Sequence, residues 1–233
     1  MNILTVIPAR KGSKGLPKKN ESFIEGKSLF GWVWDEIRDI DGLPVKICSS
    51  DSQVIGALAK QVGWEVPFIR PANLAGDKVK VIEVINHALD FFELENKKFT
   101  HVLVLQTTSP TVTKNDIEKA IKLAGNNRYD TIISAYKWQD VNPSTMFTKV
   151  DGSDQLNWVM DGSYRELRRQ DFPNIFVRTG LFYLARTDVI RKGTFYGERI
   201  GHVEIEKNRA ICIDDEKDFK AAEDYLKLRG RNE

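Results

Sequence analysis

The first twenty residues, MNILTVIPARKGSKGLPKKN, constrain the fold of this chain more than any other segment. Ile3 to Ile7 is a short run of mostly β-branched and aliphatic residues, which predicts a strand buried on both faces. Pro8 ends this strand, because proline has no N–H to donate to a sheet. The loop that follows contains two glycines and five cations: Gly12, Gly15, Arg10, Lys11, Lys14, Lys18 and Lys19.

The composition of this loop predicts a phosphate-binding site. Open α/β sheets hold anionic ligands at the carboxyl ends of their parallel strands. Glycines let backbone N–H groups approach an anion closely, and lysines and arginines neutralise it. A solvated basic loop is the alternative interpretation, but so many cations directly after a buried strand favour the anion site.

Strand-like and helix-like segments alternate from residue 2 to residue 136. This pattern predicts a Rossmann-like α/β fold, with a doubly wound, mainly parallel sheet and right-handed crossovers. We expect strands at 3–7, 45–48, 101–106 and 129–136 and a short extended piece at 66–69. We expect helices at 29–38, 79–95 and 115–124, and one that Asp51 or Ser52 caps and that runs to about Val62. Functional residues should gather where strands end, after Ile7, Cys48, Gln106 and Tyr136.

The pattern changes from Lys137 to Phe172, where turn signals separate short strand-like pieces. We interpret residues 137–172 as a β-rich dimerisation arm inserted in a single domain that spans residues 1–233. The apolar and aromatic side chains of the arm have no evident core of their own, and burial against a second subunit would provide one. After the arm we expect a pair of core strands, or one long strand interrupted at Gly180, at 175–185. A short helix at 187–192, strand-like pieces within 203–213 and a closing helix at 215–229 follow.

The overall composition is that of a soluble globular protein. The formal net charge is only +2, so the basic character of the first loop is local and a nucleic-acid-binding role is disfavoured. Cys48 and Cys212 lie far apart and provide no disulfide framework, which favours a reducing compartment. The sequence has no apolar run of the roughly twenty residues that a membrane span needs, and no apolar signal-peptide core at its start. We expect a cytoplasmic protein.

Gly26-Lys27-Ser28 invites comparison with the phosphate loop of NTPases. That motif requires a glycine five residues before Gly26, and this chain has Glu21 there. The spacing therefore excludes a phosphate-loop NTPase.

Six segments, in order along nearly the whole chain, resemble the motifs of the CMP-sialic acid synthetases (acylneuraminate cytidylyltransferases), a family that includes enzymes for legionaminic and pseudaminic acid. The amino-terminal signature comprises Pro8-Ala9-Arg10, Gly12-Ser13-Lys14-Gly15 and Lys19-Asn20. The other segments are Ser49-Ser50-Asp51-Ser52, Glu65 to Pro71, Leu105-Gln106 with Thr108-Ser109-Pro110, Arg168 to Asp171 with Pro173, and Ile213-Asp214 with Asp218-Phe219. Their shared order is a more specific signal than the first motif, because other sugar nucleotidyltransferases have similar loops.

The resemblance implies nucleotidyl transfer, in which the anomeric hydroxyl of an acidic nine-carbon sugar attacks the α-phosphate of CTP and pyrophosphate leaves. Such a site needs cations, N–H donors and usually Mg²⁺, because charge accumulates on the phosphate oxygens. The residues that the resemblance implies in catalysis are Arg10, Lys14 and Lys19. Those that it implies in nucleotide binding are Arg10, Ser13, Lys14, Lys19, Asn20 and Arg70.

The sugar-binding residues that the resemblance implies are Gln106, Thr108, Ser109, Arg168, Arg169 and Gln170. Gln106 ends the expected central strand and so faces the crevice, although an amide there can also be an ordinary capping group. Arg168 and Arg169 suit an acidic sugar, because guanidinium groups bind carboxylates in a bidentate manner. An exposed basic pair on the arm is the alternative. The resemblance also implies a homodimer whose arms reach across, so these arginines could serve either subunit's site.

Asp214 is the residue best suited to bind Mg²⁺, because it follows the strand-like piece 211–213 and Mg²⁺ is typically held by one or two carboxylates plus phosphates. The family usually has a second aspartate at the position of Cys212, and a thiol is a poor ligand for this hard ion. Three explanations stay open: one carboxylate with waters suffices, Asp215 substitutes, or metal use is weakened. Asp214 or Asp215 could instead cap the closing helix.

Other departures from the family pattern fall mainly at the expected metal and sugar positions. They are Lys11, Lys80-Val81, Thr107, Thr111-Val112 and Thr179-Gly180. The triphosphate loop is nearly intact. We therefore hypothesise a sugar other than the commonest sialic acid, such as legionaminic or pseudaminic acid.

Two alternative functions stay open. A nucleotidyltransferase for another base or a neutral sugar would share the first loop, but the Arg168-Arg169 pair favours an anionic sugar. A non-catalytic nucleotide-sugar-binding protein would account for Cys212 as a mark of lost activity. It would bind nucleotide without Mg²⁺-dependent turnover.

Overall fold

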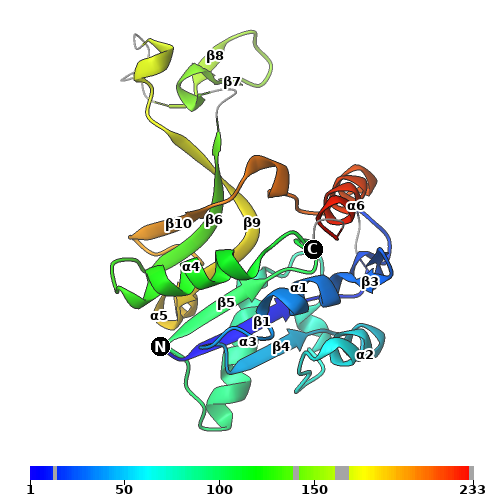
Figure 1. Ribbon diagram of the computed structural model, residues 1–233. Helices are drawn as coiled ribbons and strands as arrows, with labels where there is room; N and C mark the ends of the chain where they lie inside the picture. The colour runs from blue at the N-terminus through cyan, green and yellow to red at the C-terminus, as the bar shows by residue number, and fades with distance from the viewer. Residues whose placement is uncertain (13–14, 139–141, 161–167, 231–233) are drawn as a thin grey trace.

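The computed structural model describes residues 1–12, 15–138, 142–160 and 168–230 (Figure 1). In these residues a central sheet of six strands has the order β10-β6-β9-β5-β1-β4. Its strands are β1 (Ile3–Pro8), β4 (Val45–Ser49), β5 (His101–Leu105), β6 (Thr131–Trp138), β9 (Ile175–Arg186) and β10 (Ile200–Glu204). The β1–β4, β1–β5 and β10–β6 pairs are parallel, whereas β9 is antiparallel to β5 and β6. The predicted α/β, mainly parallel fold is confirmed.

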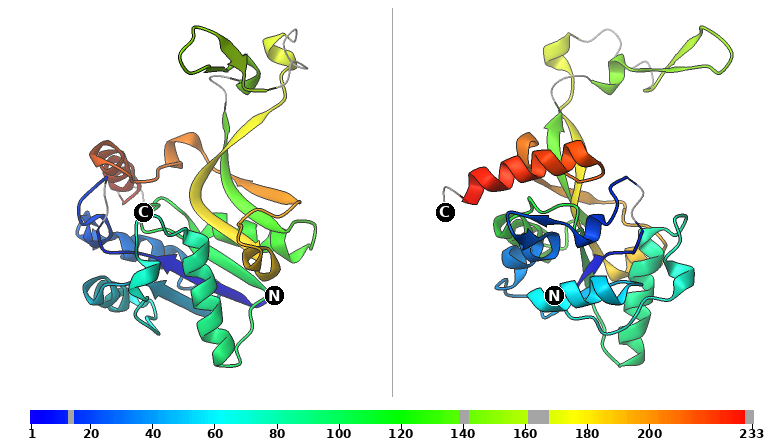
Figure 2. Two further views of the ribbon diagram at one scale, coloured as in Figure 1. Left: turned by 180° about the vertical axis from the view of Figure 1, so that it is seen from behind. Right: turned by 90° about the vertical axis from the view of Figure 1, so that its right-hand side faces the viewer.

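Helices cover both faces of the sheet (Figures 1 and 2). One face carries α1 (Leu29–Ile37), α2 (Gln53–Val62) and α4 (Lys114–Gly125). The other carries α3 (Val81–Leu94) and α5 (Thr187–Arg191), and α6 (Glu216–Gly230) packs beside the start of α1. Short 3-10 helices are η1 (Lys19–Glu21), η2 (Ala72–Leu74), η3 (Pro143–Thr145), η5 (Arg169–Asp171) and η6 (Lys207–Arg209). Within the described residues, none of the helices has the length and hydropathy to cross a membrane.

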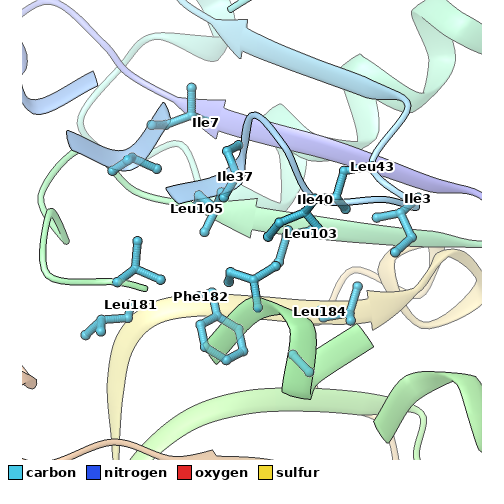
Figure 3. Close-up of a cluster of buried hydrophobic side chains, with 14 of the residues drawn as sticks. Ile3, Ile7, Ile37, Ile40, Leu43, Leu103, Leu105, Leu181, Phe182 and Leu184 are labelled. Carbon is cyan, nitrogen blue, oxygen red and sulfur yellow. The ribbon is translucent and has the colours of Figure 1, made fainter. Parts of the chain in front are cut away.

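The alternation of side chains along β1 lets one strand supply two cores. Ile3 and Ile7 belong to the cluster under α1, α2 and α4, while Leu4 and Val6 belong to the cluster under α3. Figure 3 shows the first cluster, where Ile37 of α1 lies over the side chains of the strands. Burial of each such side chain contributes about 1.5–3 kcal/mol. The apolar run at the start of the chain is therefore a central strand, as its sequence predicts.

Three helices begin with a capping side chain just after a strand or a short hairpin. The Ser28 hydroxyl accepts a hydrogen bond from Gly31 N at the start of α1, and Ser52 does the same for Ile55 N at α2. Thr113 and Asp116 form a reciprocal capping box at α4. Since α2 and α4 follow the carboxyl ends of β4 and β5, their entry loops lie at the same edge of the sheet as the first loop.

Some expected elements differ in the structure. The expected extended piece at 66–69 is not a sheet strand, and Glu65 makes one isolated bridge with Ile47. Within 203–213 only the first residues are sheet, because β10 ends at Glu204 and η6 follows. The turn-rich segment after the first loop contains a small hairpin, β2 (Phe23–Ile24) and β3 (Lys27–Ser28). Pro67 has no N–H, which disfavours continuous pairing of residues 66–69.

β6 and β9 continue together beyond the body of the domain and carry a projecting arm (Figures 1 and 2). Trp138 pairs with Ile175 at the outer end of this ribbon. A short hairpin, β7 (Phe147–Lys149) and β8 (Leu156–Trp158), lies at the tip. The rings of Phe147 and Trp158 contact each other, with centroids 4.1 Å apart. Several apolar side chains of the arm stay exposed: Met146, Phe147, Leu156, Trp158 and Val159.

Candidate active site

A pocket of about 250 Å³ opens at the carboxyl ends of β1 and β5. This edge of an open α/β sheet is where ligands bind. The described residues that line the pocket are Pro8, Arg10, Lys19, Asn20, Arg70, Leu74, Gly76, Val79, Val81, Val84, Gln106, Thr107 and Thr108. The structure therefore brings Arg10, Lys19, Asn20, Arg70, Gln106 and Thr108 together, as predicted for a shared site.

Arg10 reaches across the mouth of the pocket from the end of β1. Its Nη1 lies 2.5 Å from Asp77 Oδ1 and also donates to the carbonyl oxygen of Ala75 at 3.5 Å. The Arg10 side chain is 33% exposed, and that of Asp77 is 42% exposed. An exposed pair of this kind is weak and is screened by salt. A phosphate group with more charge can therefore replace Asp77 as the partner of Arg10.

Asn20 joins the first loop to the loop after β5. Its Nδ2 donates to the carbonyl oxygen of Arg10 at 2.9 Å. Its Oδ1 accepts from the hydroxyl of Thr107 at 2.5 Å. Thr107 stands where the resemblance has a proline, which has no hydroxyl for this contact. The predicted nucleotide-binding residue Asn20 thus also fixes the position of the Arg10 backbone.

Lys19 contacts the carboxy-terminal part of the chain. Its Nζ donates to the carbonyl oxygen of Ile213 at 2.7 Å and to Asp214 Oδ1 at 2.9 Å, across 195 residues of sequence. The Lys19 side chain is 11% exposed, whereas Asp214 is 79% exposed. Gly15 lies against the same segment, since a Cβ there would sit 2.2 Å from the Asp214 carbonyl oxygen. Only glycine fits at this close approach.

The segment between β10 and α6, residues 205–215, is fastened to the loop after β5. Ile213 N donates to the carbonyl oxygen of Thr108 at 2.8 Å. Arg209 makes two hydrogen bonds to the buried carboxylate of Asp116, at 2.7 and 2.9 Å, and these raise the pKa of Arg209. Thr111 Oγ1 donates to the carbonyl oxygen of Arg209 at 2.7 Å. This segment therefore holds the carbonyl of Ile213 in place for Lys19.

Arg70 is the most deeply buried cation of the pocket, at 4% exposure. Its Nη2 lies 3.3 Å from Asp51 Oδ1, and the same oxygen accepts from Lys11 N at 2.9 Å. Burial lowers the pKa of Arg70, and Asp51 opposes this effect. The Nε of Arg70 is buried and has no acceptor among the described residues. A buried donor without an acceptor is uncommon in folded proteins.

Gln106 and Thr108 form the side of the pocket under β9. Gln106 Nε2 donates to the carbonyl oxygen of Gly180 at 3.2 Å, and Thr108 Oγ1 donates to Gln106 Oε1 at 3.2 Å. Ser109, in contrast, is completely buried, and its hydroxyl has no partner among the described residues. The structure therefore places Gln106 and Thr108 at the pocket and Ser109 beneath it.

Among the candidate metal ligands, Asp214 has an exposed carboxylate. Asp214 is exposed beside Lys19, while Asp215 Oδ1 accepts from Asp218 N at 2.9 Å and so caps α6. Cys212 Sγ lies 3.5 Å from Thr108 Oγ1. Among the described residues, no three His, Cys, Asp or Glu side chains gather as a metal cluster. One carboxylate fits a Mg²⁺ ion whose other ligands are phosphate oxygens and waters.

The remaining predicted residues lie away from the described pocket or outside the described residues. Ser13 and Lys14 lie outside them. Arg168 Nε donates to Asp171 Oδ2 at 2.7 Å, and the Arg168 side chain is 75% exposed. Gln170 is exposed beside it, and for Arg169 only the backbone, in η5, is described. Within one chain these arm residues are not brought to the pocket.

Sequence reasoning did not assign roles to several residues that build the site. Asp77 and Asp51 are the carboxylates that hold Arg10 and Arg70. Val81 and Val84 supply the apolar wall at the start of α3. Val84 is part of the predicted amphipathic helix, but only the fold shows that this end of the helix faces the pocket. Asp51 lies in the Ser49–Ser52 segment that the resemblance singled out, but its pairing with Arg70 was not predicted.

The sequence model of a protein family described as Cytidylyltransferase matches residues 4–229. The chain belongs to the cytidylyltransferase family. A curated relative, the N-acylneuraminate cytidylyltransferase of Escherichia coli, is 27% identical over 221 residues, which are 94% of this chain and 51% of that protein. The pseudaminic acid cytidylyltransferase of Campylobacter jejuni is 24% identical over 229 residues, covering 98% of this chain and 97% of that protein. The resemblance seen in the motifs is confirmed.

The cytidylyltransferase fold is also found in a solved structure of CMP:2-keto-3-deoxy-manno-octonic acid synthetase complexed with CTP. That structure has a TM-score of 0.70 and 15% identity, and the match covers 98% of this chain and 100% of that chain. At this identity the likeness supports the fold. This cytidylyltransferase spans about half the length of the Escherichia coli relative and nearly all of the Campylobacter jejuni one.

Proposed function

We propose that this cytidylyltransferase transfers CMP from CTP to the anomeric hydroxyl of an acidic nine-carbon sugar and releases pyrophosphate. The observation that carries the proposal is the convergence of Arg10, Lys19 and Arg70 on one pocket that also exposes Gln106. Relatives named for N-acylneuraminate and pseudaminic acid support the class of sugar.

The reaction is an in-line displacement at the α-phosphorus. The sugar oxygen forms a bond to phosphorus, the bond to the oxygen that bridges the α- and β-phosphates breaks, and the hydroxyl proton passes to solvent. Charge develops on the departing pyrophosphate, so cations placed beforehand lower the barrier. Arg10 exchanges Asp77 for phosphate oxygens, and Lys19 offsets charge on the leaving group. Ser13 and Lys14 also bind the triphosphate.

The nucleoside lies against Arg70 and the apolar wall of α3. Arg70 lines the pocket, and its positive charge suits the anionic nucleotide. Val81 and Val84 pack against the base, and Asn20 holds the loop that carries Arg10.

Mg²⁺ would be held by Asp214 and by phosphate oxygens, and when bound it would neutralise charge on the triphosphate. The single carboxylate fits this role because Mg²⁺ usually keeps several waters. Lys19, which lines the pocket, contacts Asp214. Cys212 takes no part in this binding.

The sugar site is completed in a homodimer. The exposed apolar side chains of the arm, Phe147 and Trp158 among them, are buried against a second subunit. Arg168, Arg169 and Gln170 belong to the sugar-binding set and act on the partner's sugar, whereas Ser109 lies buried beneath the pocket. The protein works in the cytoplasm, and its sugar is a bacterial relative of sialic acid, such as legionaminic or pseudaminic acid.

Pyrophosphate release tests the proposal. Purified protein with CTP and Mg²⁺ is offered N-acetylneuraminate, legionaminate, pseudaminate and a neutral hexose. We expect release with an acidic nine-carbon sugar, and no comparable rate with UTP, GTP or ATP. Release with the neutral hexose alone would contradict the acidic-sugar assignment. CTP binding without release for any sugar would favour a non-catalytic nucleotide-sugar-binding protein.

A further inference from the structure

The peptide unit between Arg10 and Lys11, just after β1, is held by hydrogen bonds at both of its polar groups. Its carbonyl oxygen, that of Arg10, accepts from Asn20 Nδ2 at 2.9 Å. Its N–H, that of Lys11, donates to Asp51 Oδ1 at 2.9 Å. A peptide unit is a rigid plane, so two hydrogen bonds on its two sides fix its orientation. They thereby fix the backbone from which the Arg10 side chain and the glycine-bearing loop begin.

The orientation of the Asn20 amide follows from the chemistry of its two partners. The Arg10 carbonyl can only accept, so the amide nitrogen of Asn20 faces it. The amide oxygen then faces Thr107, whose hydroxyl must donate, and these two oxygens lie 2.5 Å apart. Arg10 and Thr107 thus hold the amide from two sides. Without the hydroxyl, the amide oxygen of Asn20 would have no donor among the described residues.

The loop that carries Thr107 is itself tied to other parts of the structure on both sides of this residue. Before it, Gln106 Nε2 donates to a backbone carbonyl of β9 at 3.2 Å. After it, the carbonyl oxygen of Thr108 accepts from Ile213 N at 2.8 Å. Thr107 is 2% exposed, so its side chain is packed. A hydroxyl that is already fixed loses little further freedom when it binds Asn20, which makes it an effective anchor.

The bond between Thr107 and Asn20 is a feature of this sequence. At the position of Thr107 the family pattern has a proline, which has no hydroxyl. The bond joins residues 87 positions apart, one from the first loop and one from the loop after β5, and both residues line the pocket. This chain therefore connects its two pocket loops through a contact that a proline could not make.

We propose that Thr107 is a positioning residue for triphosphate binding, whose hydroxyl orients the Asn20 amide and through it the peptide unit that carries Arg10. The hydroxyl has one hydrogen and donates it to Asn20, so its effect on the nucleotide passes through Asn20 and Arg10. This inference rests on the proposed function, because it assigns a support of Arg10 to the triphosphate site of that reaction.

Calorimetric titrations of the full chain with CTP and with CMP test the inference. Thr107→Val removes the hydroxyl and keeps the branched shape, whereas Thr107→Ser keeps the hydroxyl. Asn20→Ala removes the amide, and the double variant Thr107→Val/Asn20→Ala completes a double-mutant cycle. Thr131→Val is the matched control. Thr131 is 1% exposed and its hydroxyl donates to the carbonyl oxygen of Phe195 at 2.8 Å, but it begins β6, at the edge of the sheet opposite the pocket.

We expect Thr107→Val to raise the Kd for CTP about three- to tenfold, the effect of losing one neutral hydrogen bond. The Kd for CMP should stay unchanged, because CMP lacks the phosphates that the first loop binds. Thr107→Ser should bind both nucleotides as the parent does. Asn20→Ala should weaken CTP binding at least as much as Thr107→Val, and in that background Thr107→Val should have no further effect. Thr131→Val should match the parent.

The inference is overturned if Thr107→Val binds CTP as tightly as the parent, or if it weakens CTP and CMP binding equally. It is also overturned if Thr107→Ser is as weak as Thr107→Val, or if the two single effects add in the double variant, since the hydroxyl would then not act through Asn20. If Thr107→Val does not fold, Thr107→Ala takes its place in the cycle. Failure of both variants to fold would mean that the hydroxyl maintains the fold instead of the site, and would overturn the inference as well.

The same titrations separate this inference from the proposed function. A parent that binds no CTP contradicts the proposed function, and the inference falls with it. A parent that binds CTP but releases pyrophosphate with no sugar contradicts the proposed function alone, because the titrations of the Thr107 and Asn20 variants still decide the inference. A parent that is active and a Thr107→Val variant with the parent's Kd for CTP remove the inference alone.

Discussion

The charged side chains of the pocket and those of the projecting arm make contacts of two different kinds. In the pocket, each cation is held by contacts from distant parts of the chain, such as Lys19 on Ile213 and Asp214. In the arm, Arg168 pairs with Asp171 three residues away and is largely exposed. Long-range contacts fix a geometry before the ligand arrives, whereas local exposed pairs do not. In the described residues the pocket is therefore held by long-range contacts within one chain, whereas the ion pair of Arg168 in the arm is local.

The largest expected effect on stability comes from breaking the buried pair between Arg209 and Asp116. Arg209→Met leaves the carboxylate of Asp116, which is 1% exposed, without its partner. We expect the free energy of unfolding to fall by about 3–5 kcal/mol, measured by urea denaturation. The matched variant in the arm, Arg168→Met, should change it by less than about 0.5 kcal/mol. If both variants lost the same free energy of unfolding, the long-range pair in the body would be no more stabilising than the local pair in the arm.

The next largest effect concerns catalysis. Lys19→Ala removes a largely buried cation of the pocket, which we propose offsets charge on the leaving group. The kcat/KM for CTP should therefore fall by about 10²–10³-fold, as for loss of one preorganised donor. Lys27→Ala is the control, since Lys27 pairs with Asp35 outside the pocket and should leave the rate unchanged. A Lys19→Ala variant with the parent's rate would show that this cation does not act on the triphosphate.

A smaller effect is expected at the tip of the arm. Phe147→Ser combined with Trp158→Ser removes two rings in tilted contact that are 45% and 37% exposed in one chain. We expect the dimer dissociation constant in sedimentation to rise at least about tenfold, while CTP binding stays the same. Phe23→Ser, which changes an exposed ring on the body, is the control. A parent that is monomeric at micromolar concentration would contradict the proposed dimer.

The smallest expected effect is the acid dependence of stability. Hydrogen bonds from Arg199 lower the pKa of Asp130 to about 2. A carboxyl whose pKa is lowered by folding contributes its stabilisation above its unfolded value, near 4, and loses it as the pH falls toward 2. Asp130→Asn should therefore be less stable than the parent at pH 7 and nearly equal to it near pH 2, by urea denaturation. Asp171→Asn, in the arm, should leave the free energy of unfolding unchanged at pH 7, because the partner of Asp171 is an exposed arginine.

The sequence predicted those parts of the site that are contiguous in the chain. β1, Pro8 and the cations after it lie within one segment, so their spatial proximity follows from the strand alone. Long amphipathic helices such as α3 were predicted for the same local reason. The contact between Lys19 and Asp214 lies outside such reasoning, because it joins residues 195 positions apart.

The position of Arg178 was out of reach of sequence reasoning for a different reason. Its position depends on β9 entering the sheet antiparallel between β5 and β6, and on the bulge at Gly180. Neither the partner strands nor a register change can be determined from the alternation of residues in one strand. The sequence also presented Thr179-Gly180 only as a departure from the family pattern, whereas the structure shows Thr179 bonded to Ser134.

Calorimetric titration with CTP and with CMP tests the central claim most directly. The central claim is that Arg10 and Lys14 of the first loop bind the triphosphate before any sugar binds. Replacement of both residues by alanine should weaken CTP binding at least about a hundredfold, with each lost charge-assisted contact contributing tenfold or more, and should change CMP binding little. A double variant that binds CTP as tightly as the parent would contradict the account.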